Sequence, residues 1–473
     1  MILRLERALL GMFPMPIKTH CVPTLLISLL LVSTCLPVRA TIQNTRDVDI
    51  DATIRGQVLE EIIRQLRRRY VLPGAVGKIE ERLKEKLRTG GYDNAVTAVK
   101  FAQQLTEDLR VAADDLHFDV RHNPEREQAL TAAGTGIKKK LPDIPLTGAE
   151  LQSLRERNYG FGEVKVMLGN VGYLGLSSFT DLRYSKSTAV AAMGFLANTD
   201  AVIIDLRQNG GGYGSLVNFL ISYFFASRPV QLMSSYDRET NTTTRGKTLR
   251  AVPGKRLANQ VVFVLTSRNT GSAAEAFAFT LQQVGRAKTV GDRTAGAAHG
   301  GGWVPVSQGF IVFIPTFRGF NPLTGKSWNG IGVKPDVSAS PDRSLEVAHV
   351  EAAKSLLTKA STDSQRRQMN WILPLLELRA FGQKQVSPRK LDDYDARYEG
   401  ITISLVEGQL TFLGASGIRR NLLALGDDYF LVEDLTVPPE NQARIRFVRD
   451  SGGKIIELQL LVSDGRAFRR PRL

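Results

Sequence analysis

The sequence predicts a mixed α/β protein with a largely parallel sheet, preceded by a helical region and followed by a small antiparallel β-domain. Three patterns carry this prediction. Apolar residues recur at helical spacing within residues 50–112. Segments typical of strands and helices alternate between residues 162 and 358, which favours a parallel sheet because each helix provides a crossover connection. From about residue 394, short strand-like runs alternate with turns.

Length and composition agree with a globular protein of several domains. Of the 473 residues, 43% are hydrophobic and 23% are charged, which provides enough apolar material for a sizeable core. We expect an N-terminal helical domain at 41–130, an α/β domain at 160–360 and a C-terminal β-domain at 390–473. A less regular segment connects the first two.

The N-terminus resembles a secretory signal peptide at residues 1–40. Basic residues precede an apolar run at 22–36, and small residues at 38–40 provide a cleavage site after Ala40. An uncleaved anchor is the alternative, although the run is short for a membrane span. A signal peptide predicts a periplasmic or extracellular location.

Both cysteines of the chain, Cys21 and Cys35, lie within this expected signal peptide. Cleavage after Ala40 leaves a chain without cysteine. Disulfides, a thiol nucleophile and cysteine metal sites are therefore excluded from the mature protein.

The formal net charge of +15 is spread along the chain. A solvated basic surface explains it, and attraction to a membrane is expected only through surface charge or a signal anchor. No nucleic-acid-binding module accompanies the charge, so no nucleic-acid partner is expected. Oligomer formation is left open.

The helical region is expected to contain three helices. Apolar residues place the first around 54–66, and Pro73-Gly74 ends it. The next two span 79–87 and 95–109. The turn Asp114-Asp-Leu-His-Phe118 follows.

The later elements follow from the same patterns. In the α/β domain we expect strands at 164–167, 171–176, 201–206, 261–265 and 288–290, and helices at 188–196, 215–225, from 272 onward, and at 344–358. In the C-terminal domain we expect strands at 401–405, 409–412, 429–432, 443–448 and 455–461.

Ser272 stands where the strand-like run 261–265 passes through a polar turn into an Ala/Phe-rich helix. A serine at such a helix start lies beside free backbone N–H groups, which can stabilise negative charge on an attacked carbonyl oxygen. The glycines Gly210–Gly212, after the strand at 201–206, let the backbone approach a ligand. Together these segments indicate a serine nucleophile with an oxyanion hole.

Both segments also have another interpretation. Ser272-x-x-Glu275 fits a capping box, in which the hydroxyl satisfies a helix N–H group. The glycines fit an ordinary turn or a phosphate loop. However, the Lys-Ser/Thr ending of a P-loop and the G-x-G-x-x-G spacing are absent, which argues against nucleotide binding.

Four ordered blocks resemble the tail-specific, or C-terminal-processing, serine peptidase family, which also contains tricorn-like peptidases and the interphotoreceptor retinoid-binding protein repeats. The resemblance covers roughly residues 165–340. It implies a crotonase/ClpP-like catalytic core and favours the nucleophile interpretation of Ser272. The blocks are Asp205–Gly212, Ser272–Glu275, Gly291–Gly296 and Gly330–Asp336.

A serine hydroxyl needs a base to become an effective nucleophile. One branch of the family places a lysine just after the third block, where this chain has Ala297. The tricorn-like branch takes a histidine from the N-terminal portion, and His117 matches that place. His299 is an alternative base, but we expect it to bind substrate or shape the glycine-rich loop.

The partner that orients the histidine is less clear. The tricorn-like pattern has a serine beside the histidine and a glutamate before the last block, and this chain has Leu116 and Asn329 there. Asn329 can orient an imidazole by hydrogen bonding, without supplying charge. Asp114, Asp115 and Asp119 are local alternatives.

The remaining site residues come from the resemblance and the local physics. Gly211 and Ala273 are expected to donate to the oxyanion, and Gly212 and His299 to contact substrate. No residue cluster has metal-ligand spacing, so neither a metal nor another cofactor is expected.

The resemblance implies a secreted or periplasmic serine peptidase that acts on peptides or unfolded proteins. The alternative is a catalytically weak or inactive relative that binds a lipophilic ligand or a peptide, because the retinoid-binding relatives carry such ligands on this scaffold. The absent lysine, Leu116 and Asn329 favour the alternative, and Ser272 with its glycine loop favours the peptidase.

Overall fold

The structure is a computed structural model that describes residues 47–134, 146–386 and 388–473. The expected signal peptide, with Cys21 and Cys35, lies outside these residues. Within the described ranges, no helix is long and apolar enough to cross a membrane.

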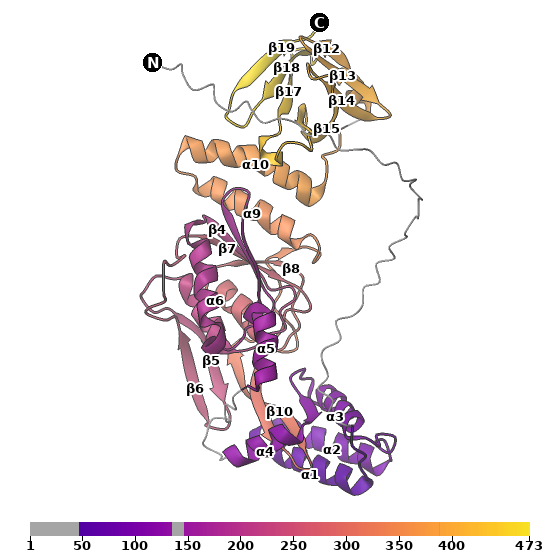
Figure 1. Cartoon of the computed structure of the whole chain (residues 1–473), viewed down its shortest axis with the longest axis vertical. Helices are drawn as coiled ribbons and strands as arrows, with labels where there is room; N and C mark the ends of the chain where they lie inside the picture. The colour runs from indigo at the N-terminus through magenta and orange to yellow at the C-terminus, as the bar shows by residue number, and fades with distance from the viewer. Residues whose placement is uncertain (1–46, 135–145, 387) are drawn as a thin grey trace, which may run out of the picture. The chain divides into compact units, whose positions relative to one another are not determined.

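The N-terminal region contains the three predicted helices, α1 (Ala52–Arg69), α2 (Val76–Arg88) and α3 (Ala98–Ala113), drawn in indigo to violet in Figure 1. Two further helices that the sequence did not predict, α4 (Pro124–Ala133) and α5 (Gly148–Glu156), precede the α/β region. The side chains of Asp51 and Thr97 accept first-turn N–H groups and so cap α1 and α3.

A five-stranded sheet, separate from the main sheet of the α/β region, connects these helices to that region. Its strands are β1 (Asp119–His122), β5 (Gln231–Asp237), β6 (Thr242–Lys247), β9 (His299–Pro305) and β10 (Phe310–Phe320). The strand β10 pairs with β1, β5 and β9, all antiparallel. Buried side chains of β9 and β10, among them Val304 and Val312, share one core with the three helices. Sequence periodicity predicted none of these five strands.

The α/β region contains a six-stranded sheet in the order β11-β8-β7-β4-β3-β2. Five strands run parallel and β2 is antiparallel at one edge. This confirms the predicted largely parallel sheet. The strands are β2 (Phe161–Met167), β3 (Val171–Leu176), β4 (Ala201–Asp205), β7 (Val261–Thr266), β8 (Lys288–Gly291) and β11 (Val337–Ser338).

Helices cover both faces of this sheet. They are α6 (Leu182–Phe195), α7 (Gly214–Tyr223), α8 (Ala273–Gln283) and α9 (Ser344–Lys359). Ile204 and Val264 pack in a core with α6, α7 and α8, whereas Ile203 and Leu265 pack against α9. Alternate residues of a strand point to opposite faces, so burial on both faces explains why β4 and β7 are continuous apolar runs.

The C-terminal region begins with α10 (Asp363–Phe381), which packs beside α9, and α11 (Pro388–Tyr394). Eight antiparallel strands follow, as drawn in yellow tones in Figure 1. They are β12 (Ala396–Tyr398), β13 (Ile401–Val406), β14 (Gln409–Leu413), β15 (Arg419–Gly426), β16 (Tyr429–Val432), β17 (Arg444–Arg449), β18 (Ile455–Leu461) and β19 (Ala467–Pro471). Sequence patterns predicted all but β12, β15 and β19.

The eight strands close on themselves. Tyr398 of β12 bridges Arg472 after β19, and the Glu399 N–H donates to the Pro471 carbonyl at 3.2 Å. Closure removes the free strand edges that an open sheet would expose. Apolar side chains, including Phe430 and Phe447, fill the interior.

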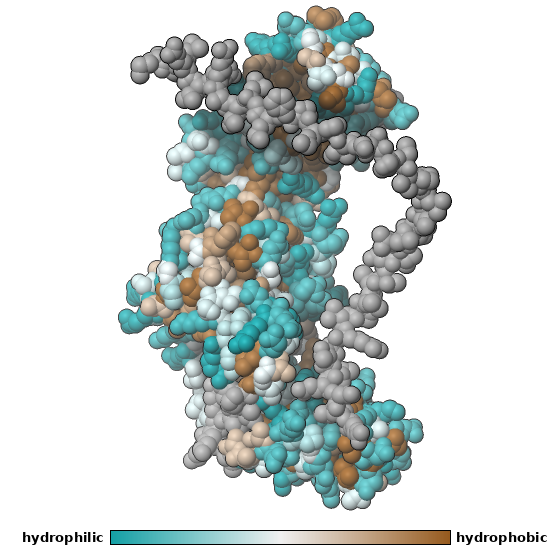
Figure 2. Space-filling model, viewed as in Figure 1, coloured by the Kyte–Doolittle hydropathy of each residue, from teal (hydrophilic) through white to brown (hydrophobic). Residues whose placement is uncertain are grey.

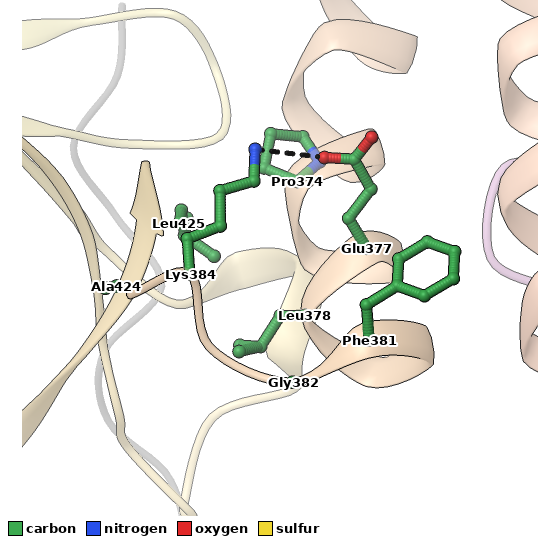
Figure 3. A pocket seen from close by; sticks show the side chains of 8 residues that line it. All are labelled: Pro374, Glu377, Leu378, Phe381, Gly382, Lys384, Ala424 and Leu425. Atoms are coloured by element: carbon green, nitrogen blue, oxygen red, sulfur yellow. Dashed lines mark ion pairs between the residues drawn. The ribbon is translucent and has the colours of Figure 1, made fainter. Parts of the chain in front are cut away.

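Polar residues cover most of the face drawn in Figure 2, with apolar residues among them, most visibly over the α/β region. A pocket of about 210 Å³ lies between α10 and β15, beside the ion pair of Glu377 and Lys384 (Figure 3). Its lining comes from α10, the segment just after α10, and β15, and includes none of the predicted site residues.

Candidate active site

Ser272 lies where the chain leaves β7 and enters α8, at the carboxyl end of a parallel strand. Its backbone angles, φ 50° and ψ −116°, fall in a region that residues with a Cβ atom rarely occupy. Sharp strand-to-helix turns of this kind present the nucleophilic serine of other hydrolases. The strained backbone therefore marks Ser272 as a candidate nucleophile, a signal that the sequence pattern alone could not provide.

Glu275 holds this turn in place. Its fully buried carboxylate accepts the Ser272 N–H at 2.8 Å, the Gly296 N–H at 2.7 Å and the Ala297 N–H at 2.7 Å. The Thr294 hydroxyl donates to it at 2.5 Å. Four donors match the capacity of a carboxylate. Glu275, the second member of the predicted capping box, thus also fixes the loop that follows β8.

His117 lies in the turn between α3 and β1, and its Nε2 atom is 3.3 Å from the Oγ atom of Ser272. Its Nδ1 atom is 3.0 Å from Asp115 Oδ1, which also accepts the His117 N–H at 3.1 Å. The imidazole is one-tenth exposed. Serine, imidazole and carboxylate therefore lie in series, in the order of a Ser-His-Asp triad.

Asp115 is almost completely buried and is surrounded by donors. Besides His117, the Tyr70 hydroxyl donates to Oδ2 at 3.2 Å, and Nδ1 of His299 lies 2.7 Å from the same oxygen. Burial raises the pKa of Asp115, but hydrogen bonds and charge interactions with His117 and His299 outweigh burial and hold this pKa well below its usual range. Burial and the nearby carboxylate hold the pKa of Tyr70 well above its usual range.

The ionised carboxylate determines the tautomer of the histidine beside it. A carboxylate without a proton can only accept hydrogen bonds. Nδ1 of His117 must therefore carry a hydrogen, and in the neutral imidazole Nε2 presents its lone pair toward Ser272.

The glycine loop after β4 approaches Ser272 closely, because a Cβ atom on Gly211 would lie 2.8 Å from the Ser272 Cβ atom. However, the Gly211 N–H donates to Asn209 Oδ1 at 2.9 Å, so this expected oxyanion donor is already engaged. Gly212 is exposed, and Ala273 is the first residue of α8, where an N–H group has no partner within the helix.

Two predicted residues lie elsewhere than expected. Asn329 accepts the Ala298 N–H at 3.3 Å, and Asp115 takes the place beside the imidazole that was assigned to Asn329. His299, which was expected to bind substrate or shape the glycine-rich loop, is 5% exposed, and its Nδ1 atom lies 2.7 Å from Asp115 Oδ2. In the sequence, the only signal for this carboxylate was its position two residues before His117 in the same turn. That signal left Asp115 as one of three local alternatives.

In the described part of the chain, no group of three or more His, Cys, Asp or Glu residues has an arrangement that could hold a metal ion. The site contains a hydroxyl, two imidazoles, two buried carboxylates and backbone N–H groups. These groups suit acyl transfer through a serine.

Two family models match successive parts of the chain. Residues 170–339 match the model of peptidase family S41, and residues 52–159 match the model of the N-terminal domain of peptidase S41 in eukaryotic interphotoreceptor retinoid-binding protein. Together the two matches span more than half of the chain.

Two similar curated proteins are both named as peptidases that process carboxyl termini. A carboxy-terminal-processing protease of Bartonella bacilliformis is 28% identical over 174 residues, which is 36% of this chain and 38% of that protein. The chloroplastic carboxyl-terminal-processing peptidase 3 of Arabidopsis thaliana is 25% identical over 201 residues, 42% of this chain and 37% of that protein. The chain thus matches little more than a third of the length of either relative.

Similar solved structures include mature CPAF complexed with lactacystin, at 13% identity and a TM-score of 0.42 over 67% of this chain and 99% of that chain. The tricorn protease has 15% identity and a TM-score of 0.40 over 65% of this chain and 37% of that chain. The two family models follow each other along the chain in the order of helical region and α/β region, and they show that the chain contains a peptidase family S41 domain preceded by an S41 N-terminal domain.

Proposed function

We propose that the chain is a serine peptidase that hydrolyses peptide bonds through an acyl-enzyme on Ser272, with His117 as general base and Asp115 as the carboxylate that orients it. The approach of His117 Nε2 to within 3.3 Å of Ser272 Oγ carries this proposal. The strained turn at Ser272 and the buried Asp115 support it.

In the proposed reaction, Ser272 Oγ bonds to the peptide carbonyl carbon while its proton moves to His117 Nε2. The tetrahedral intermediate then collapses, the C–N bond breaks, and His117 returns the proton to the leaving amine. Water then gives a proton to His117 as its oxygen bonds to the acyl carbon, the ester C–O bond breaks, and His117 returns the proton to Ser272 Oγ while the carboxylic acid leaves. Asp115 stays ionised throughout.

The oxyanion of the intermediate requires aligned N–H donors. We assign this role to Ala273 and to the Gly211–Gly212 segment, where Gly212 is exposed and Gly211 donates to Asn209 in the free protein. A substrate carbonyl that enters the loop would compete with Asn209 for the Gly211 N–H.

We propose peptides or unfolded proteins as substrates, in keeping with the family. The signal-like residues 1–40 lead us to propose a periplasmic or extracellular location. The alternative, a catalytically weak or inactive relative that binds a lipophilic ligand or a peptide, is less well supported, because a binding protein has no need for an imidazole between a serine and a buried carboxylate.

Covalent labelling with a fluorophosphonate probe tests the mechanism. The wild-type chain is expected to label on Ser272, Ser272→Ala to abolish labelling, and His117→Ala to slow it on the order of 10⁶-fold, as for nucleophile or base removal in other serine peptidases. Peptide mapping by mass spectrometry locates the label.

Two variants serve as matched controls. Ser187→Ala removes an exposed serine of α6, and His122→Asn removes a histidine that packs against Phe310, so both should label at the wild-type rate. A folded wild-type chain that resists the probe, or a label on another serine, would contradict the proposal.

A further inference from the structure

The two oxygens of Asp115 serve two different histidines. Oδ1 accepts the N–H and the Nδ1 hydrogen of His117, and Oδ2 faces Nδ1 of His299 at 2.7 Å and the Tyr70 hydroxyl at 3.2 Å. The shorter contact belongs to His299. Because a carboxylate is planar, a donor fixed at Oδ2 also fixes the direction in which Oδ1 faces.

His299 is well placed to act as a fixed donor. Its side chain is 4% exposed, and its backbone is paired with Arg318 where β9 begins. The chain enters β9 from the loop that Glu275 holds through Thr294, Gly296 and Ala297. The position of this imidazole therefore depends on the carboxylate that also holds the N–H of Ser272.

These contacts form a closed ring. From Ser272 it passes through Glu275 to the loop before β9, then along the chain to His299 and across Asp115 to His117, which faces Ser272 again. Nucleophile and base come from segments 155 positions apart in the sequence. The ring connects them through groups that are buried or nearly so.

We propose that His299 is a positioning residue for the serine–histidine pair: by donating from Nδ1 to Asp115 Oδ2, it orients the carboxylate so that Oδ1 holds the His117 ring against Ser272. This inference rests on the proposed function. His299 touches neither substrate nor the reacting atoms and acts through Asp115. The expectation that it binds substrate is replaced by this role.

The role has a consequence for acid pH. The groups that face Asp115 are Tyr70 from the end of α1, His117 from its own turn and His299 from β9, with Asp114 next to it in sequence. Removing the His299 donor removes one of the interactions that lower the pKa of Asp115, so this pKa rises. Activity should then be lost at a higher pH than in the wild type.

Two substitutions separate hydrogen bonding from space filling. His299→Asn keeps a neutral donor near the position of Nδ1, whereas His299→Leu keeps bulk and removes the donor. The full chain is titrated with a fluorophosphonate, and the maximal labelling rate and the half-saturating probe concentration are measured from pH 4 to pH 9. We expect His299→Leu to lower the maximal rate roughly 10²-fold, the effect of a small misplacement of a reacting group.

The half-saturating concentration should change less than twofold, the acid limb of the His299→Leu profile should move to higher pH, and His299→Asn should recover most of the rate. The matched control is His349→Leu, which removes a buried histidine that binds the Leu168 carbonyl at 2.8 Å and lies on α9, the helix packed against the opposite face of the parallel sheet from α8. It should leave the labelling rate and profile of the folded fraction unchanged.

The outcomes distinguish this inference from the proposed function. A wild-type chain that does not label overturns both. A labelled wild type with a His299→Leu variant of equal rate and equal pH profile overturns only the positioning role. A His299→Leu variant whose half-saturating concentration rises while its maximal rate is kept would return His299 to substrate binding. If His299→Leu does not fold, His299→Ala takes its place as the variant without a donor, and a folded fraction that equals His349→Leu in rate and pH profile overturns the positioning role.

Discussion

Ser272 combines an unfavourable backbone conformation with a chemical role. A side chain at φ 50° and ψ −116° costs on the order of 1–3 kcal/mol, and such strain persists only where the surroundings over-determine it. Here Glu275 holds the N–H of Ser272 while the glycine loop packs against its Cβ atom. The strain is what places the hydroxyl at the end of the strand rather than along the helix.

This strain predicts a difference between two inactive variants. Ser272→Gly and Ser272→Ala both lack the hydroxyl, but only glycine occupies this region of backbone angles without a Cβ penalty. We expect Ser272→Gly to have a free energy of unfolding about 1 kcal/mol above that of Ser272→Ala, measured by urea denaturation. Equal stability of the two would show that the turn is unstrained.

Asp115 should matter through the tautomer that it imposes. In Asp115→Asn the amide can donate to Nδ1 of His117, which then carries its hydrogen on Nε2 and cannot accept the serine proton. We expect the labelling rate to fall roughly 10⁴-fold with little change in fold. Asp114→Asn is the matched control, because Asp114 adopts a left-handed conformation that asparagine tolerates. A small effect of Asp115→Asn would remove Asp115 from the mechanism.

Glu275 supports both the stability of the fold and the geometry of the site. Glu275→Gln turns one acceptor oxygen into a donor that faces other donors, so buried N–H groups lose their partner. We expect a loss of about 1–3 kcal/mol in the free energy of unfolding, and slower labelling at temperatures where the variant is folded. Glu85→Gln, which alters an exposed pair with Arg88 on α2, should change stability by less than about 0.5 kcal/mol.

At the scale of elements, the position of His117 depends on how the N-terminal helices meet the α/β region. The strand that follows His117 pairs with β10, and the Val71 N–H donates to the Pro315 carbonyl at 2.9 Å. The turn between β5 and β6 supplies Arg238, which donates to backbone carbonyls at the end of α1, and Glu239, which pairs with the buried Arg69.

The Arg69–Glu239 pair provides a test of this contact. Arg69→Met leaves Glu239 buried without its charge partner, and burial already raises the pKa of Glu239. We expect a loss of about 3–5 kcal/mol in the free energy of unfolding. Labelling should slow as well, because His117 depends on the same interface.

Adding Glu239→Gln to Arg69→Met should restore part of the stability, because it removes the buried unpaired charge. Arg64→Met, at a largely exposed position of α1, should have no comparable effect. If the double variant is no more stable than Arg69→Met alone, the loss reflects packing rather than charge.

At the scale of the whole molecule, the buried carboxylate links stability to pH. The folded pKa of Asp115 lies below its unfolded value of about 3.9, so its stabilising contribution is complete above the unfolded pKa and is lost as pH falls toward the folded pKa. We expect the difference in thermal midpoint between wild type and Asp115→Asn to be constant from pH 6 to pH 8 and to shrink below about pH 4. A difference that grows toward acid pH would have the wrong sign.

The sequence alone determined much of the molecule. The three N-terminal helices, the parallel strands and the positions of Ser272 and His117 at element ends follow from local patterns, because periodicity and turn residues are properties of short segments. The hairpins β5–β6 and β9–β10 were not predicted. The strand β6 is polar and the strand β9 is rich in glycine, so neither of these two strands shows the residue pattern typical of a strand.

Only the tertiary structure decided which groups meet. Asp115 and His299 are 184 positions apart, and no spacing rule brings them together; the pairing of β1 and β9 with β10 does. The sequence likewise does not predict the contact that closes the eight-stranded C-terminal sheet, or the hydrogen bond that the Gly211 N–H donates to Asn209. Local patterns set where a side chain can stand, but directional hydrogen bonds between distant segments decide its partner.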